Sequence, residues 1–216
     1  MVAWRIYHLH GATPKLPLKS GLVNDIFAIF SPGYNGSGLE ATTTPTWPTT
    51  LTAYSFSMWV NPAALTNASG TGVDLIGFDY THRLAIDTSS GTLSGWIGAD
   101  TTYGQAYSAS GSALAPQTGW HYVVMTYAQS DTGGPHLFLD GNEVTYSYRT
   151  PPVGNAAAGN GMGIAEYPGY GGWGGNFNGS MSEARIAGGA LSSNWILTEF
   201  NNQNNPTGFI AVRPQQ

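Results

Sequence analysis

The side chains with the clearest potential for chemistry are the rings and amides of one glycine-rich segment, YPGYGGWGGNFNG at 167–179. Glycine has no side chain to cover a neighbouring ring, so these rings are expected at the surface of a loop. Aromatic faces stack on the C–H patches of sugars while amides hydrogen-bond the hydroxyls, and the same groups anchor protein interfaces. The alternative is that the rings fold back onto the protein. The ligand-binding residues predicted here are Tyr167, Tyr170, Trp173, Asn176 and Asn178.

A second segment, TTYGQAYSAS at 101–110, has the same character. Tyr103, Gln105 and Tyr107 are expected on an exposed aromatic loop. The same two interpretations apply, because these rings would either contact a ligand or pack onto the protein.

Residues suited to catalysis or metal binding lack the spacing that those roles require. The chain has five His residues and many Ser, but no G-x-S-x-G elbow that would expose a nucleophilic serine. His8 and His10 alternate on one strand face with no third ligand nearby, which favours a solvated edge pair over a metal site. No catalytic residue, metal or cofactor is predicted. The acids in loops or at strand ends that match no compact calcium loop are Asp74, Asp79, Asp100 and Asp131.

The elements that position these residues are predicted to be β-strands. In YSFSMWV at 54–60, apolar and small polar residues alternate, and this period of two predicts a strand. WHYVVMTY at 120–127 is apolar on both faces and predicts a central strand, while Gly141-Asn142 predicts a hairpin. Together the segments predict an antiparallel meander. The residues sharing one face of the first strand are Tyr54, Phe56, Met58 and Val60. Further strands are expected at 73–78, 82–87, 92–97, 136–140, 143–149, 162–166 and 180–187.

One segment has the pattern of a helix, LSSNWILTEFNNQ at 191–203. Ser192 or Ser193 is the expected N-cap. Trp195, Ile196 and Phe200 follow at helical spacing before the polar NNQNNP ends the helix.

The length of 216 residues fits a single β-sandwich. Residues 1–30 hold three of the seven basic residues and are predicted to form an N-terminal arm or edge strands, with one domain over 31–216. The arm has two interpretations: it adds edge strands to its own sandwich, or it completes the sheet of a neighbouring subunit. Residues 41–52 form a Thr/Pro-rich connection.

Composition excludes several classes of protein. Charged residues are 9% of the chain against about 25% in an average domain, which disfavours helical architecture, while 41% hydrophobic residues disfavour disorder. The net charge is −5 without a basic cluster, so nucleic acid is not an expected partner. The chain has no cysteine, no apolar run long enough for membrane insertion and no secretory leader. If the protein is extracellular, we expect it to leave the cell by another route.

The second half of the chain resembles the laminin G-like jelly rolls of the concanavalin A-like lectin and glucanase superfamily. The matching pieces, in the order of that family, are SFSMWVNP (55–62), GWHYVVMTY (119–127), LFLDGNEV (137–144), FNGSMSEARI (177–186) and ALSSNWILTEFNNQNNP (190–206). The resemblance implies an all-β fold: an antiparallel two-sheet β-sandwich with one short helix near the C-terminus. It also implies binding at the concave sheet and at the loops of one end, but no single function.

The spacing of the acidic residues argues against a glucanase. Glucanases that resemble this fold carry their catalytic carboxylates two or four residues apart on one strand, because those side chains share a face. No two acids of this chain have that separation. Glu183 and Arg185 share a strand face instead, and are predicted to form a structural ion pair that ties their strand to a loop. Asp140 is predicted to fix the geometry of its hairpin.

Two functions therefore follow from the sequence. The first is a non-catalytic structural module of a virus particle, most simply a phage, that decorates a capsid or tail in symmetric copies, lies on the virion surface and adheres to cell-surface glycans. The second is a free-standing, extracellular carbohydrate-binding lectin. A glycoside hydrolase is the weaker third alternative.

Overall fold

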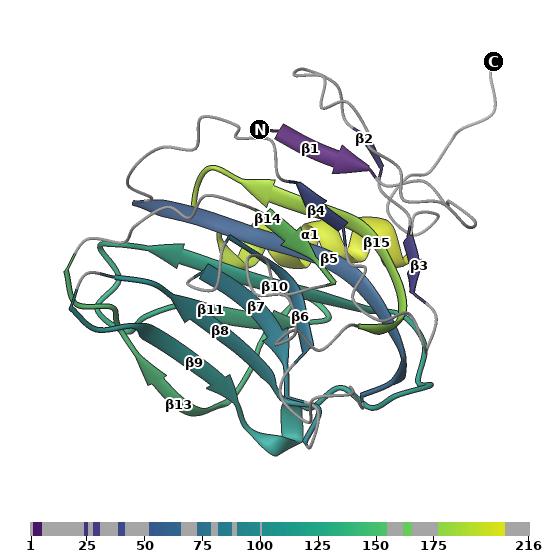
Figure 1. The fold of residues 1–216 in the computed structure, drawn as a ribbon, viewed down its shortest axis with the longest axis horizontal. Helices are drawn as coiled ribbons and strands as arrows, with labels where there is room; N and C mark the ends of the chain where they lie inside the picture. The colour runs from purple at the N-terminus through teal and green to yellow at the C-terminus, as the bar shows by residue number, and fades with distance from the viewer. Residues whose placement is uncertain are drawn as a thin grey trace, which may run out of the picture.

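The computed structural model describes residues 52–65, 73–78, 82–87, 90–99, 101–154, 162–165 and 177–205, and the short strands at 2–5, 24–25, 28–30 and 39–41. These residues form two β-sheets that pack face to face (Figure 1). The predicted fold class, an antiparallel two-sheet β-sandwich with one helix near the C-terminus, is confirmed. No helix in this part of the chain has the length and apolar character that a membrane span requires.

The first sheet contains β1 (Val2–Arg5), β2 (Asn24–Asp25), β3 (Ala28–Phe30), β5 (Ala53–Ala64), β10 (His121–Ala128), β11 (His136–Leu139), β12 (Asn142–Glu143) and β15 (Asn178–Ala187). Its strand order is β12-β11-β10-β5-β15-β1-β2, with β3 also paired to β15. The β1–β2 pair is parallel.

The second sheet contains β4 (Leu39–Ala41), β6 (Val73–Phe78), β7 (His82–Ile86), β8 (Leu93–Ile97), β9 (Gly104–Ser108), β13 (Tyr146–Thr150) and β14 (Met162–Ile164). Its order is β13-β9-β8-β7-β6-β14-β4, so β13 is an edge strand. A 3-10 turn, η1 (Ser110–Ser112), follows β9, and the helix α1 (Ser193–Asn204) follows β15.

The core between the sheets is built by alternation along β5 and β10. Met125 of β10 lies opposite Phe56 of β5, and both side chains are fully buried. Burying an apolar side chain of this size stabilises the fold by about 1.5–3 kcal/mol. The predicted central position of β10 is confirmed, because it pairs with β5 on one side and β11 on the other. The predicted core residues of β5, each at most 1% exposed, are Tyr54, Phe56, Met58 and Val60.

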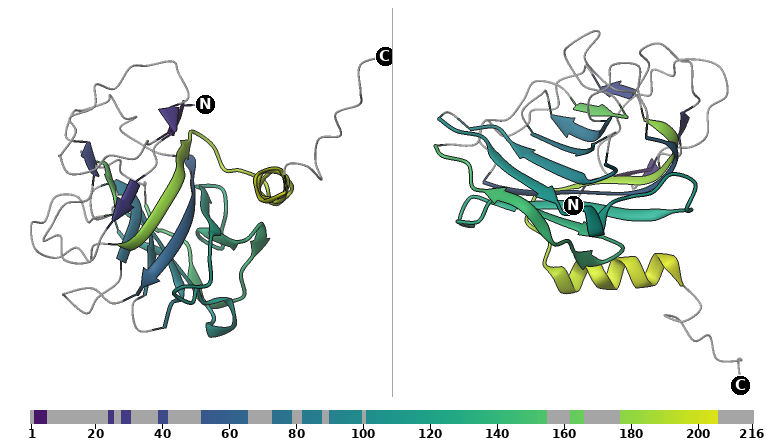
Figure 2. Two further views of the ribbon diagram at one scale, coloured as in Figure 1. Left: turned by 90° about the vertical axis from the view of Figure 1, so that its right-hand side faces the viewer. Right: turned by 90° about the horizontal axis from the view of Figure 1, so that it is seen from below.

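The helix α1 covers the outer face of the first sheet (Figure 2). It begins after Ser192, whose Oγ accepts a hydrogen bond from the backbone N–H of Trp195 at 3.3 Å. Ile196 is fully buried, and Phe200 stacks on Trp59 with ring centroids 5.7 Å apart. Trp195 is 52% exposed, because successive helical residues point about 100° apart and it cannot share the buried side of Ile196. The predicted helix and N-cap are confirmed.

Polar side chains hold α1 on the sheet beside these rings. Tyr122 donates its hydroxyl hydrogen bond to Glu199 Oε2 at 2.7 Å, and burial, with the charge of Glu199, raises the pKa of Tyr122 well above its usual range. Arg185 contacts the carboxylates of both Glu183 and Glu199. The predicted Glu183–Arg185 ion pair is confirmed. Its further partner is the helix rather than a loop, because β15 runs beneath α1.

The turn between β11 and β12 is formed by Asp140 and Gly141, since Leu139 pairs with Asn142. Both turn residues have positive φ, 51° and 80°, as an Asp-Gly turn of type I′ requires. The prediction of a Gly141-Asn142 turn is therefore wrong by one residue. Asp140 Oδ1 accepts a hydrogen bond from the Tyr122 N–H at 2.9 Å, so the predicted role of Asp140 in the hairpin is confirmed.

The segment 143–149 was expected to form one strand and is instead divided between the sheets. Glu143 ends β12 in the first sheet, and Tyr146 begins β13 in the second. Val144, between them, is only 6% exposed and belongs to the core. Burial of this side chain draws the backbone across the edge of the sandwich, so the two pieces pair with different sheets.

The described strands of the N-terminal region lie beside β15. Val2 of β1 pairs with Ile186, and Ile29 of β3 pairs with Ser180. Most of residues 1–30, including His8 and His10, and most of the expected connection at 41–52 lie outside the described residues. The division of the chain into 1–30 and 31–216 stays a prediction.

Candidate functional site

Most of the predicted binding loop cannot be compared with the structure. Tyr167, Tyr170, Trp173 and Asn176 lie outside the described residues. Asn178 opens β15, and its side-chain oxygen Oδ1 is buried with no hydrogen-bond partner among the described contacts. The role of this loop in binding stays a prediction.

Within the segment 101–110, Gly104–Ser108 form the strand β9 where a loop was expected, while Tyr103 precedes the strand and is 43% exposed. Gly104, Ala106 and Ser108 are buried on the inner face of β9, while Gln105 and Tyr107 point to the outer face. This small–large alternation is a strand period that the aromatic content of the segment had obscured. At Gly104 a Cβ atom would lie 2.5 Å from Pro152, so glycine permits the close approach of the chain there. Because they belong to a strand, Gln105 and Tyr107 both point to the outer face of the sheet.

Aromatic rings line the outer face of β8, β9 and β13. Tyr107 lies opposite Tyr148 in the register of β9 and β13, with ring centroids 6.1 Å apart. Trp96 of β8 meets Tyr107 edge-on at 6.0 Å and Tyr103 at 6.3 Å. Cross-strand neighbours on one face hold each other in place. We call these four residues, Trp96, Tyr103, Tyr107 and Tyr148, the aromatic face.

Polar groups adjoin the aromatic face at Trp96. Gln105 lies opposite Trp96 on β9, and Arg83 lies opposite it on β7, with the guanidinium 4.7 Å from the ring centre. Arg83 Nη1 is 3.5 Å from Asp74 Oδ1. Burial raises the pKa of Asp74 to about 6, although the charge and hydrogen bond of Arg83 act to lower it. The face thus combines flat rings with an amide, a cation and a buried carboxyl group.

The two sheets differ in what lies on their outer faces. The helix α1, the first sheet and the second sheet form successive layers, with α1 on the outer face of the first sheet (Figure 2). On the second sheet Tyr148 is 52% and Tyr103 43% exposed. Aligned exposed rings on a sheet are typical of a binding surface. Sequence analysis found Tyr103, Gln105 and Tyr107 but missed Trp96 and Tyr148, whose proximity depends on strand register.

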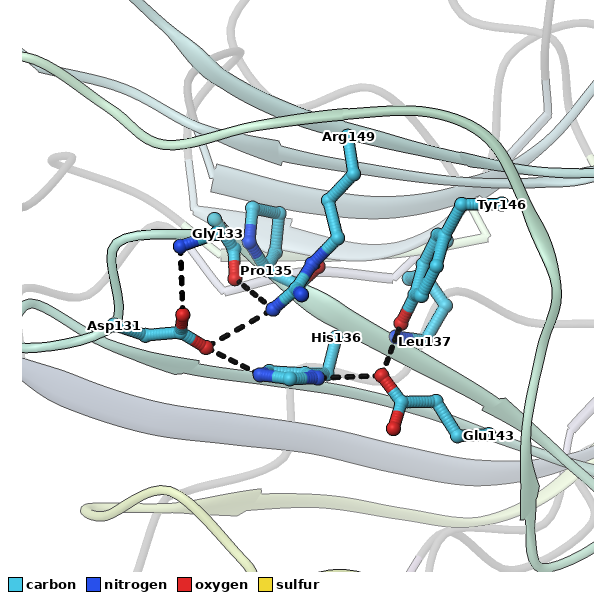
Figure 3. Close-up of polar contacts among 9 residues, drawn as sticks. Asp131, Gly133, Pro135, His136, Leu137, Glu143, Tyr146 and Arg149 are labelled. Atoms are coloured by element: carbon cyan, nitrogen blue, oxygen red, sulfur yellow. Dashed lines mark hydrogen bonds and ion pairs between the residues drawn. The ribbon is translucent and has the colours of Figure 1, made fainter.

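A charged cluster lies beside β13, where the two sheets meet (Figure 3). His136 contacts Asp131 through Nε2 and Glu143 through Nδ1. Arg149 Nη2 donates to Asp131 Oδ2 at 2.9 Å, and the Tyr146 hydroxyl donates to Glu143 Oε1 at 2.7 Å. We call these five residues, Asp131, His136, Glu143, Tyr146 and Arg149, the charged cluster.

Ionisation of the two carboxyl groups in the charged cluster is favoured. Burial opposes the ionised form of Asp131, but hydrogen bonds from the Gly133 N–H and His136, and the charge of Arg149, outweigh it and lower its pKa. Burial likewise opposes ionisation of Glu143, and contacts with His136 and Tyr146 outweigh it, so this pKa is also lowered. Both groups are acceptors at neutral pH.

One contact set in the structure has the connectivity of a catalytic triad. His121 Nδ1 lies 2.9 Å from Asp140 Oδ2, and its Nε2 lies 2.9 Å from Thr118 Oγ1. The Thr118 hydroxyl has one proton and donates it to the Ala115 carbonyl at 2.7 Å. The hydroxyl proton of Thr118 therefore does not point at His121, as proton transfer in a triad would require. These contacts instead stabilise the start of β10.

In the described part of the chain, pairs of acidic residues that lie near each other share a basic side chain. Asp131 and Glu143 flank His136, while Glu183 and Glu199 flank Arg185. The described residues hold no group of three or more His, Cys, Asp or Glu side chains arranged for a metal ion.

The layers and strand order define an antiparallel jelly roll, the class of fold that the sequence resemblance implied. The chain belongs to the concanavalin A-like lectin/glucanases superfamily, whose family model matches residues 35–197. Comparison with curated protein sequences gives no match.

Solved structures share the fold at low sequence identity. Domain 4 of AbnA, a GH43 extracellular arabinanase from Geobacillus stearothermophilus solved with arabinotriose, has a TM-score of 0.55 and 17% identity, with 91% of this chain and 85% of that chain covered. A candidate carbohydrate-binding protein from Bacteroides ovatus has a TM-score of 0.52 and 20% identity, covering 72% and 42% of the two chains. The binding domain of Paraclostridial Mosquitocidal Protein 1 has a TM-score of 0.51 and 13% identity, covering 71% and 38%. This chain therefore spans less than half of the latter two.

Proposed function

We propose that this protein is a non-catalytic carbohydrate-binding module that holds a glycan chain against the aromatic face. The observation that carries the proposal is the row of Trp96, Tyr107 and Tyr148 on the second sheet, with Gln105 and Arg83 beside it. Rings supply stacking surfaces for pyranose or furanose units, and the amide and guanidinium supply directional hydrogen bonds to hydroxyls. The family membership and the arabinotriose complex of the AbnA domain support the same substrate class.

The shape of the face predicts modest affinity for each ligand chain. A ligand on an exposed sheet is only partly enclosed, whereas small-molecule pockets bury most of the ligand surface. We therefore expect a dissociation constant on the order of 0.1–1 mM for a short oligosaccharide, within the weak range of binding free energies. An extended polysaccharide that spans several rings should bind more tightly.

The test is affinity electrophoresis in native gels that contain arabinan, galactan, xyloglucan or sialylated mucin. Wild-type protein should be retarded in at least one gel, and Trp96→Ala should lose the retardation. Trp195→Ala is the control, because it removes an exposed indole from the helix side of the molecule, away from the aromatic face. Retardation that persists in Trp96→Ala would show that the glycan binds outside the aromatic face. The variant Trp173→Ala would then test binding by the predicted loop, which contains Tyr167, Tyr170, Trp173, Asn176 and Asn178.

Attachment of the module to a virus particle is a separate proposal that rests on composition. The low charge and the high Gly, Ser and Thr content are typical of exposed virion modules, and such a module would be present on the particle in symmetric copies. Cosedimentation with purified particles would support this localisation, and a free monomer at all protein concentrations would favour the free-standing lectin.

A further inference from the structure

The charged cluster fastens the strand that carries Tyr148. Among the described strands, β13 lies at the edge of the second sheet and its backbone pairs with β9 alone. From its other side, Arg149 donates to the Pro135 carbonyl at 2.9 Å and to the Gly134 carbonyl at 2.7 Å. Tyr146 is held by Glu143 and by the Leu137 N–H, which donates to the Tyr146 hydroxyl at 2.9 Å. Tyr146 and Arg149 are thus anchored to the β11–β12 hairpin and to the loop before it (Figure 3), and Tyr148 lies between them in the sequence of β13.

The loop before β11 packs directly against β13, so a displacement of the loop would affect the strand. Gly134 has a φ of 94°, and a Cβ atom there would lie 2.2 Å from the Thr150 carbonyl oxygen. A Cβ atom at Gly133 would lie 2.6 Å from Arg149 Nη1. Displacement of this loop would therefore remove contacts at the end of β13.

His136 connects both carboxylates only when both of its ring nitrogens carry hydrogen. Asp131 and Glu143 accept hydrogen bonds as ionised groups, so each nitrogen that faces them must donate. A neutral imidazole has one N–H, so one nitrogen lone pair would face a carboxylate oxygen. Loss of the proton would therefore replace an attraction by a repulsion within the cluster.

We infer that His136 is a positioning residue for glycan binding: as an imidazolium it clamps the β11–β12 hairpin to β13 and holds Tyr148 in the aromatic face, so that glycan affinity falls when His136 loses its proton. This inference rests on the proposed function. His136 does not touch the glycan, and its effect passes through the positions of Tyr146 and Arg149 on β13.

The groups around His136 in the described part of the chain come from three elements. Asp131 lies in the loop before β11, Glu143 lies in β12, and Tyr146 and Arg149 lie in β13. On the other side, β10 places Thr126, which does not titrate, opposite His136. Since the pKa values of both carboxyl groups are lowered, Asp131 and Glu143 stay ionised in mild acid and continue to accept hydrogen bonds there.

The experiment compares wild-type protein with His136→Gln at about pH 6 and pH 8.5, a range across which histidine usually changes charge. Glycan affinity is measured by retardation in gels of arabinan, galactan, xyloglucan and sialylated mucin. We expect wild-type affinity to fall about fivefold at the higher pH, a typical coupling between two sites. His136→Gln should bind weakly at both values, like wild type at high pH. Because Asp74 also titrates, the readout is the difference between the two proteins at each pH.

His121→Gln is the matched control, because it removes a second histidine–carboxylate contact that lies away from β13. It should keep the wild-type pH profile. A His136→Gln protein with the wild-type profile, or a His121→Gln protein without it, would overturn the inference.

A second readout separates this inference from the proposed function. Amide exchange protection factors for residues 146–150 should fall at high pH in wild type and be low at both values in His136→Gln. If no gel retards the protein at any pH, the proposed function fails, and these protection factors alone decide whether His136 holds β13. Equal protection in both proteins would refute that role.

Discussion

Replacing Asp74 by asparagine should make the protein more stable and a poorer binder. Asp74 is 3% exposed, and its pKa of about 6 lies above the 3.8 of a free aspartate. Ionisation of the group in the folded state therefore costs about 3 kcal/mol even with Arg83 nearby. Asparagine is neutral and nearly isosteric, so Asp74→Asn should remove this cost wherever the wild-type group is ionised.

The sign of the pH dependence follows from the raised pKa. Below about pH 4 the carboxyl group is protonated in both states, so the two proteins should be similarly stable. Between about pH 4 and pH 6 only the unfolded chain ionises, and wild-type stability falls as the pH rises. Above pH 6 the advantage of Asp74→Asn should level off at about 3 kcal/mol. Urea unfolding followed by tryptophan fluorescence at several pH values measures this difference.

Asp131→Asn is the matched control with the opposite sign. The pKa of Asp131 is lowered, so its contribution to stability is present above the unfolded pKa and lost as the pH falls. The control should therefore be less stable than wild type near neutrality. An Asp74→Asn protein that is less stable than wild type at pH 8 would refute the reasoning, since the ion pair with Arg83 would then outweigh the cost of burial. Weaker glycan retardation of a more stable variant would assign the carboxylate to binding.

Two further substitutions test the parts that support the site. Glu199→Gln should lower the free energy of unfolding by about 2 kcal/mol, because Arg185 loses one of its two carboxylate partners beneath α1; an unchanged urea midpoint would show that ring packing alone holds the helix. Gly141→Ala should cost about 1–2 kcal/mol, because φ is 80° and the new Cβ atom would lie 3.0 Å from Leu197; calorimetry that gives wild-type stability would contradict the strained turn.

The strands predicted most accurately from the sequence are those whose two faces meet different surroundings. Alternation along 54–60 identified the core face of β5, because that face meets the second sheet while Trp59 lies beneath α1. The helix was equally visible, since Ser192 caps it and Ile196 and Phe200 share its buried side. Local periodicity is sufficient where burial differs between faces.

The sequence predicted only part of the aromatic face, because its residues are brought together by the register of three strands. Trp96 and Tyr148 are distant in the sequence and meet through β9, whose pairing no local pattern specifies. The expected single strand at 143–149 hid the crossing at Val144, and with it the position of Tyr148 on the second sheet. The charged cluster was missed for the same reason, since its members come from both sheets.

The helix on one side of the sandwich makes the molecule one-sided. A support or fusion partner joined beyond α1 would lie on the helix side of the first sheet, and the second sheet would then face away from it (Figure 2). Many copies oriented in this way would bind one polysaccharide together, and their combined avidity would exceed the affinity of a single copy by about a hundredfold or more.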